Sequence, residues 1–115
     1  MKNFRDDEFQ CKCGCGLDID QDFKMVVIKA RKLANVQFII KSGARCVEHN
    51  YRVKGKPNSS HLDGLAVDIQ CTNSRTRSII MTAFCKVGVD RIGIAEDFLH
   101  FDIDPSKAPD VTWLY

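Results

Sequence analysis

The chain has 115 residues, of which 44% are hydrophobic and 28% charged, as in a single globular domain. Seventeen Lys and Arg against fifteen Asp and Glu leave a net charge of +2, too small to indicate nucleic-acid binding. The longest apolar run, Met25 to Ile28, is far shorter than the ~20 residues of a membrane span. We therefore expect one domain over residues 1–115, binding no nucleic acid, not inserting into a membrane and acting as a monomer.

The amino terminus, residues 1–8, lacks the apolar stretch of a secretory signal peptide. We expect synthesis in the cytoplasm without a signal peptide, so that action at the cell wall or in the periplasm would need another route of release. The chain contains six cysteines: Cys11, Cys13, Cys15, Cys46, Cys71 and Cys85. Without a secretion signal we favour reduced thiols, with disulfides formed after export and a second structural metal as alternatives.

Two main helices are predicted by apolar residues that recur at intervals of three and four. The first covers residues 20–34, where basic side chains occupy the opposite, solvated face. The second is capped by Asn73, runs to about Val87 and ends at Gly88. Both patterns indicate helices with one buried face.

Four short strands are predicted by β-branched, aromatic and alternating residues at 37–41, 64–70, 90–95 and 98–104. Residues 43–63 form a long loop with one helical turn near 47–52, and loops of this length are usually functional. An irregular tail is expected from Pro105 onward. The order of elements predicts an α+β domain with a mostly antiparallel sheet of about four strands.

Two of the three histidines, His61 and His100, stand in acid-rich segments beside predicted strands. A catalytic zinc ion needs three protein ligands from His, Asp or Glu and one open position. Asp68 can return from the second strand to the position of His61, and His100 can join them from a neighbouring strand. On the residues alone, the alternative is that Asp68 and His100 are buried polar groups satisfied by hydrogen bonds.

An acidic turn precedes the second of these histidines. Asp97 stands three residues before His100, from where it could reach the attacking water as a general base. Glu96 is the alternative base at the same turn. Both carboxylates could equally belong to a solvated turn with no role in chemistry.

The chain contains Ser59-x-His61-x-x-Gly64-x-Ala66-x-Asp68, in which all six defined positions match a known peptidase signature. Similar segments occur elsewhere in order: Phe9-x-Cys11-x-Cys13-Gly14-Cys15-Gly16, Ser42-Gly43-x-Arg45-Cys46, His49-Asn50, Gly93-Ile94, Phe98-x-His100-x-Asp102 and Trp113. Over nearly its whole length the chain resembles the zinc D-alanyl-D-alanine peptidases and the related phage endolysin peptidases, in their small phage-type branch. The resemblance implies a hedgehog/DD-peptidase-like fold.

The resemblance also implies a zinc ion with three ligands, His61, Asp68 and His100. It implies a general base at Asp97, and at Arg45 a guanidinium that binds substrate and stabilises the oxyanion. For Arg45 a structural ion pair is the alternative. Ser59 resembles a substrate-binding position, with a loop-capping hydroxyl as an equal alternative.

Other polar residues near the signature are expected to play supporting roles. The signature spacing favours Asp68 over Asp63 as ligand. Asp102 is expected to orient a ligand imidazole. We expect His49 to hold Arg45 or the turn rather than to bind metal.

The activity implied by the resemblance is hydrolysis of amide bonds in peptidoglycan stem peptides. The enzyme would be a D-Ala-D-Ala carboxypeptidase or an endolysin-type endopeptidase of a phage or prophage, with the stem peptide as its partner. The alternative is a non-hydrolytic module of the same fold that contains zinc and binds wall peptide or a protein. A candidate base beside three candidate ligands favours the enzyme.

Overall fold

A five-stranded sheet in the order β1-β2-β4-β3-β5 forms the centre of the computed structural model, which describes residues 7–115. Residues 1–6 lie outside the described part, and with them most of the amino-terminal segment on which the expectation about a signal peptide rests. The strands are β1 (Ile40–Ser42), β2 (Ala66–Gln70), β3 (Arg91–Ile94), β4 (Phe98–Asp102) and β5 (Val111–Leu114). All neighbours are antiparallel except β3 and β5, so the predicted α+β fold with a mostly antiparallel sheet is confirmed.

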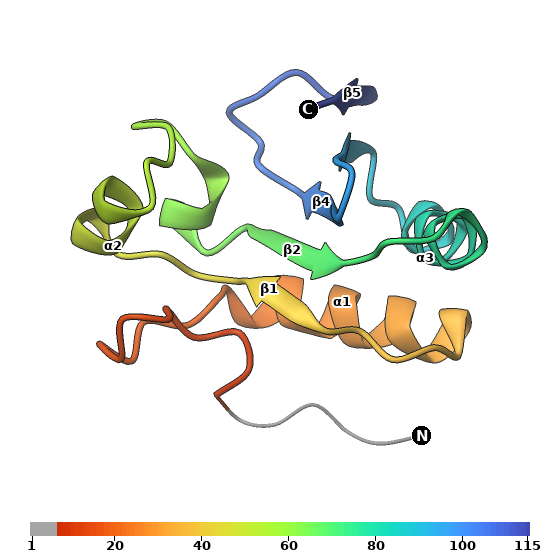
Figure 1. Cartoon of the computed structure of the whole chain (residues 1–115), viewed down its shortest axis with the longest axis horizontal. Coiled ribbons are helices and arrows are strands. Elements are labelled where there is room, and N and C mark those ends of the chain that lie inside the picture. Colours follow the sequence, from red (N-terminus) through yellow and green to blue (C-terminus); the bar gives the residue numbers. More distant parts are fainter. Residues whose placement is uncertain (1–6) are drawn as a thin grey trace.

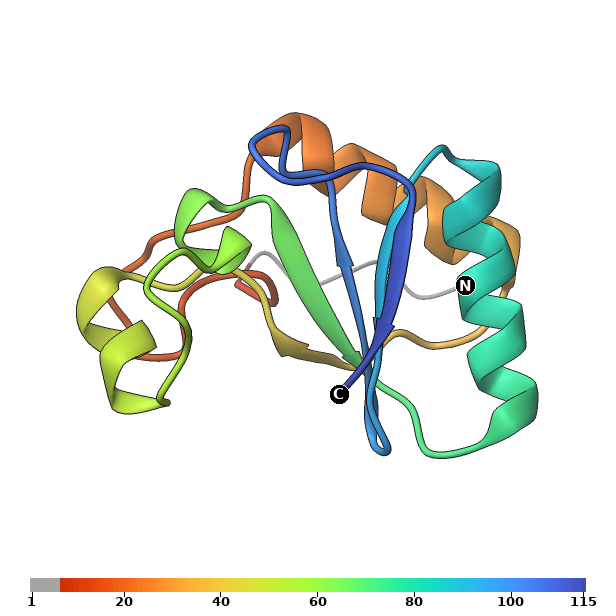
Figure 2. The ribbon, with the colours of Figure 1, turned by 90° about the horizontal axis from the view of Figure 1, so that it is seen from above.

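The two long helices, α1 (Gln21–Ala34) and α3 (Ser74–Lys86), pack against each other and against the sheet. The short helix α2 (Val47–Arg52) and the 3-10 turn η1 (Ser60–Asp63) lie toward the opposite end of the molecule from α3 (Figures 1 and 2). Within residues 7–115, no helix is both long and apolar enough to cross a membrane.

The apolar core lies between these helices and one face of the sheet. Alternation along β2 and β4 directs Val67, Leu99 and Phe101 into it. Phe84 of α3 stacks on Phe101 with ring centroids 3.7 Å apart. Because side chains alternate, the residues between these apolar positions point to the other face, which carries the polar groups described below.

Several predicted boundaries are wrong, and one strand was not predicted. The tail after Pro105 is not irregular throughout, because β5 adds to the sheet edge by parallel pairing with β3. The first strand begins at Ile40 rather than at residue 37. The strand predicted at 98–104 ends at Asp102, since the Asp104 side chain accepts a hydrogen bond from the Ser106 N–H and turns the chain.

Candidate metal centre

One row of residues crosses the whole sheet on the face opposite the core. Ser42 of β1 pairs with Asp68 of β2, and Asp68 pairs with His100 of β4. His100 pairs in turn with Gly93 of β3, and Gly93 with Trp113 of β5. Strand register therefore places a carboxylate and an imidazole, 32 positions apart in the chain, directly opposite each other.

His61 reaches the same place from η1. Its backbone N–H donates to Ser59 Oγ (3.2 Å), which caps the turn, and Gly64 ends the turn with a φ of 69°. Its ring Nδ1 lies 2.7 Å from the carbonyl oxygen of Gly43. These contacts fix the imidazole with Nε2 directed at the row.

His61, Asp68 and His100 thus meet, as the sequence predicts. Asp68 Oδ1 lies 3.3 Å from His61 Nε2 and 2.9 Å from His100 Nδ1, and the three ligand atoms all lie within 4.8 Å of one another. The residues are only 3–7% exposed. Two imidazole nitrogens and one carboxylate oxygen form the donor set of a catalytic zinc ion with one position left open.

The hydrogen bonds around this cluster determine which ring nitrogens are free. The Gly43 carbonyl can only accept, so Nδ1 of His61 carries the proton and Nε2 presents a lone pair. Asp102 Oδ2 lies 2.6 Å from His100 Nε2 and can accept a hydrogen bond from Nε2–H, leaving Nδ1 to face Asp68. When the His100 proton stays on Nε2, the Nδ1 lone pair of His100, the Nε2 lone pair of His61 and the Asp68 carboxylate converge on one point, so the residues fit a zinc ion.

The electrostatics of the buried cluster favour positive charge at this point. Burial disfavours the charged form of His100, but hydrogen bonds with Asp102 and Asp68 outweigh it and raise the pKa of that imidazole. Burial likewise opposes ionisation of Asp68, yet hydrogen bonds with His100 and His61 hold its pKa well below the usual range. The cluster thus keeps its carboxylate ionised and attracts positive charge.

Arg45 lies beside the cluster, with Nη2 3.5 Å from Asp68 Oδ2. Its Nε donates to Ser42 Oγ and its Nη1 to Asn50 Oδ1, both at 3.1 Å. The side chains that hold Arg45 are therefore Ser42 and Asn50, rather than the neighbouring His49. A Cβ on Gly55 would lie 2.0 Å from Asn50 Oδ1, so only glycine allows this close packing over the guanidinium.

A second arginine, Arg91, contacts the two residues that flank the His100 ring, Asp102 and Trp113. Arg91 Nε donates to Asp102 Oδ1 at 2.6 Å, and its guanidinium lies over the Trp113 ring, 5.1 Å from the centroid. Trp113 in turn lies 5.3 Å from the His100 ring. The contact between Asp102 and His100 is the one expected of a residue that orients an imidazole; the Arg91 contact was not predicted, because nothing local in the sequence links it to the motif.

The cluster forms the floor of a cleft of about 530 Å³. Five cationic side chains line it, against the carboxylates of Asp68 and Asp102: Arg45, Lys54, Lys56, Arg91 and Lys107. Phe98, Trp113 and Tyr115 add aromatic surface. Burial and the charge of Asp68 raise the pKa of Tyr115, which keeps that phenol neutral. The lining suits an anionic ligand with apolar parts.

The predicted substrate residue Ser59 lines the cleft, whereas the two candidate bases lie outside it. Ser59 lines the cleft and also caps η1, so both of its expected roles are compatible with its position. Asp97 and Glu96 are exposed and are not among the described residues that line the cleft. Asp97 pairs with Lys41 (3.4 Å), which lies over the ring of Phe98 at the cleft edge. Asp63 is exposed and does not line the cleft either.

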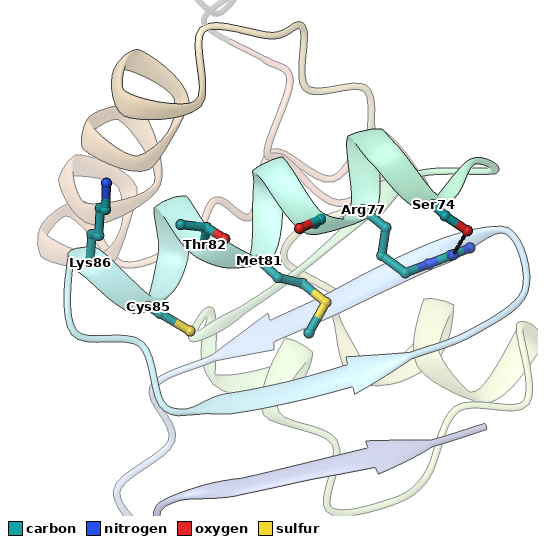
Figure 3. Close-up of a pocket in the computed structure, with 7 residues that line it drawn as sticks. Ser74, Arg77, Met81, Thr82, Cys85 and Lys86 are labelled. Atoms are coloured by element: carbon teal, nitrogen blue, oxygen red, sulfur yellow. Dashed lines mark hydrogen bonds between the residues drawn. The ribbon is translucent and has the colours of Figure 1, made fainter.

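A second hollow runs along the outer surface of α3 (Figure 3). It is lined by Ser74, Arg77, Ser78, Met81, Thr82, Cys85 and Lys86. This lining contains no carboxylate and no imidazole, so it offers neither an acid–base pair nor a zinc ligand set. The chemistry that the sequence predicts therefore belongs to the cleft of His61, Asp68 and His100.

Comparison with known families gives a match over most of the chain. The family model described as Peptidase M15 matches residues 2–103, most of the chain and all three candidate ligands. Trp113 and Tyr115 lie beyond the matched range. A comparison with curated proteins found no match.

Proposed function

The chain belongs to the peptidase M15 family of metallopeptidases, and from this premise we propose that it is a zinc enzyme that hydrolyses amide bonds in peptidoglycan stem peptides. The observation that carries the proposal is the convergence of His61, Asp68 and His100 on the floor of a cationic cleft. Stem peptides carry free carboxylates, which suit the basic lining. D-Ala-D-Ala carboxypeptidase action and endolysin-type cleavage, in a phage or prophage lysin, are the two forms this activity can take.

In the proposed mechanism His61, Asp68 and His100 hold the metal, which when bound polarises the scissile carbonyl and activates water. Arg45 is fixed by Ser42 and Asn50, so its guanidinium is already oriented when negative charge develops on the carbonyl oxygen. Such fixed donors cost no reorganisation during the reaction.

Asp97 is proposed to take the proton from the attacking water and to pass it to the leaving amine. Its carboxylate is held at the cleft edge by Lys41, so it has to leave that ion pair and turn inward when substrate binds. Catalytic contacts that are long in the free enzyme often tighten only in the substrate complex.

The same position of Asp97 favours a second candidate function. A protein with the metal cluster and the cleft, but without a base in the cleft, would bind wall peptides without cutting them. Both functions require the three-ligand metal site, so only turnover separates them.

Mass spectrometry of defined muropeptides tests the proposal. We expect the zinc-loaded protein to remove a terminal D-alanine from pentapeptides or to cut an internal stem-peptide amide, with loss of activity in His61→Ala. Release of reducing sugar ends without new amines would contradict the substrate class. Binding of the muropeptide with zinc present and no cleavage would establish the binding module instead.

A further inference from the structure

A second cluster of metal-ligating side chains lies outside the cleft. The sulfur atoms of Cys11, Cys13, Cys15 and Cys46 all lie within 4.8 Å of one another. Three separations are shorter still: Cys11 to Cys13 is 3.4 Å, Cys13 to Cys46 is 3.6 Å and Cys11 to Cys46 is 3.8 Å. All four are free thiols.

These separations match a tetrahedral metal site. Four sulfurs that each lie about 2.3 Å from a zinc ion are about 3.8 Å apart along the edges of the tetrahedron. Cys46 is 35 positions from Cys11 in the chain, so the fold itself brings the fourth sulfur to the other three. We propose that Cys11, Cys13, Cys15 and Cys46 bind a structural zinc ion.

The backbone of residues 11–17 curls so that the sulfur atoms of the cluster come together. Cys11 N–H donates to the carbonyl of Leu17 (2.7 Å), and Gly14 N–H to that of Cys11, so residues 11–17 form a closed loop. Gly14 and Gly16 have φ of 88° and 87°, which side-chain-bearing residues rarely adopt. In an extended strand, alternate residues would lie ~7 Å apart, so this curling is what lets their sulfurs converge.

Backbone amides also donate to two of the sulfurs. The N–H of Cys46 donates to Cys11 Sγ, and the N–H of His49 donates to Cys46 Sγ, both at 3.4 Å. Such outer contacts stabilise thiolates and orient metal ligands. With four thiolates the site would be closed, leaving no open position for substrate, so its role is structural.

The ion would fasten the amino-terminal loop to the segment that builds the cleft. Apart from Phe9 and Cys11, no residue of 7–17 is fully buried, so the loop has little apolar anchorage. Phe9 O accepts from Ala44 N–H (2.9 Å), and a Cβ on Gly43 would lie 2.3 Å from that oxygen. Residues 43–46 also contain Arg45 and the carbonyl that orients His61. The site is independent of the proposed function and would serve an enzyme and a binding module alike.

Metal content and cobalt spectra of the purified chain test the proposal. We expect a Cys13→Ser, Cys15→Ser double variant to contain one zinc ion fewer per chain than the parent, since both side chains are exposed and their loss leaves the core intact. After exchange with Co²⁺, the parent should show the thiolate-to-cobalt absorption of a tetrahedral sulfur site. The double variant should lack this absorption, while Cys85→Ser, on the outer face of α3 (Figure 3), should keep it.

A His61→Ala, His100→Ala variant separates this site from the cleft. It should keep the thiolate absorption, even if the protein cleaves no wall peptide. Absence of that absorption from the parent, or equal metal content in the parent and the double cysteine variant, would overturn the proposal. So would a thiol titration of the denatured, unreduced parent that finds disulfides among these four cysteines and no bound metal.

Discussion

Asp102 shows how a residue that is not a ligand can determine a ligand's state. It is 1% exposed, accepts from His100 Nε2 at 2.6 Å and is itself held by Arg91. Burial opposes its ionisation, but the hydrogen bond from His100 outweighs this and lowers the pKa of Asp102. An ionised Asp102 keeps the proton of His100 on Nε2 and leaves Nδ1 for the metal.

We therefore predict that Asp102→Asn weakens zinc binding at the cleft about 10- to 100-fold, the usual effect of losing an outer-shell partner of a ligand histidine. Competition with a chelating dye measures the affinity, in the background of the double cysteine variant so that only one site is read. Asp63→Asn, an exposed carboxylate outside the cleft, should bind zinc as the parent does. Parental affinity in Asp102→Asn would remove Asp102 from the site.

The acidic turn before β4 decides between enzyme and binding module. Removing a general base lowers the rate by about 10²- to 10⁴-fold. Asp97→Asn should lose that much turnover yet keep its zinc and its affinity for muropeptide, because Asp97 does not contact the metal cluster. Steady-state kinetics on a muropeptide and metal analysis check both halves.

Glu96→Gln is the matched control at the same turn. Its turnover rate should stay within about tenfold of the parent rate. The reason is that water and salt screen the effect of an exposed carboxylate on the reaction. A dead Glu96→Gln with an active Asp97→Asn would move the base by one residue. Parental rates in both variants would remove the general base from this turn.

At the scale of elements, β5 builds one wall of the cleft through a glycine. Gly93 of β3 has no side chain, and a Cβ there would lie 2.7 Å from the Trp113 ring and 2.8 Å from Tyr115. The Trp113 ring therefore lies directly against Gly93, with its centroid 5.3 Å from that of the His100 ring. Parallel pairing of β3 and β5 puts this aromatic pair beside the metal cluster.

Gly93→Ala should displace that wall while leaving the ligands in place. We expect a raised KM for muropeptides with unchanged zinc content, and a loss of about 1–3 kcal/mol in unfolding free energy from overpacking. Trp113 is the single tryptophan, so its fluorescence reports the displacement directly. Thr112→Ala, at the exposed neighbouring position of β5, should change neither KM nor emission; an unchanged spectrum in Gly93→Ala would contradict the expected shift.

Elements with a strong local period could be predicted from the sequence, and those made by distant pairing could not. Both long helices were predicted, with Asn73 capping α3 through the Thr76 N–H as expected. The strand β5 was missed because its four residues pair with β3, some 20 positions earlier in the chain, and such distant pairing leaves no local pattern. The turn η1 was missed for a similar reason: its stability depends on the cap at Ser59 and on contacts with distant residues.

The site residues also fall into those that the sequence predicts and those that only the fold reveals. His61 and Asp68 could be named from the signature and His100 from the segment Phe98-x-His100-x-Asp102, and the strand register explains why Asp68 and His100 meet. Asn50 stands in a segment that resembles the family but was given no role there, and Arg91 carries no motif, so only the fold reveals the contacts that these two residues make. The four-cysteine cluster depends on the return of Cys46 to the amino-terminal loop, which spacing alone does not indicate.

At the scale of the whole molecule, Asp104 ties η1, the turn that carries His61, to the segment that follows β4. It is 4% exposed and accepts from Ser60 Oγ in η1 (2.7 Å) and from Ser106 Oγ (2.6 Å), with Lys107 Nζ 3.6 Å away. Burial opposes its ionisation, but the hydrogen bonds from Ser106 and Ser60 outweigh it and lower the pKa of Asp104 to about 2.

Because the pKa of Asp104 is lower in the folded chain than the ~3.9 of an unfolded one, its contribution to stability is complete above about pH 4 and is lost as the pH falls toward 2. Asp104→Asn should therefore lower the free energy of unfolding at pH 7 by about 1–3 kcal/mol. The difference from the parent should shrink between pH 4 and pH 3.

Urea unfolding of both proteins with chelator present measures this without a contribution from metal, and Asp63→Asn should match the parent throughout. A difference that stays constant from pH 7 to pH 3 would mean that Asp104 stabilises the fold by shape rather than by charge.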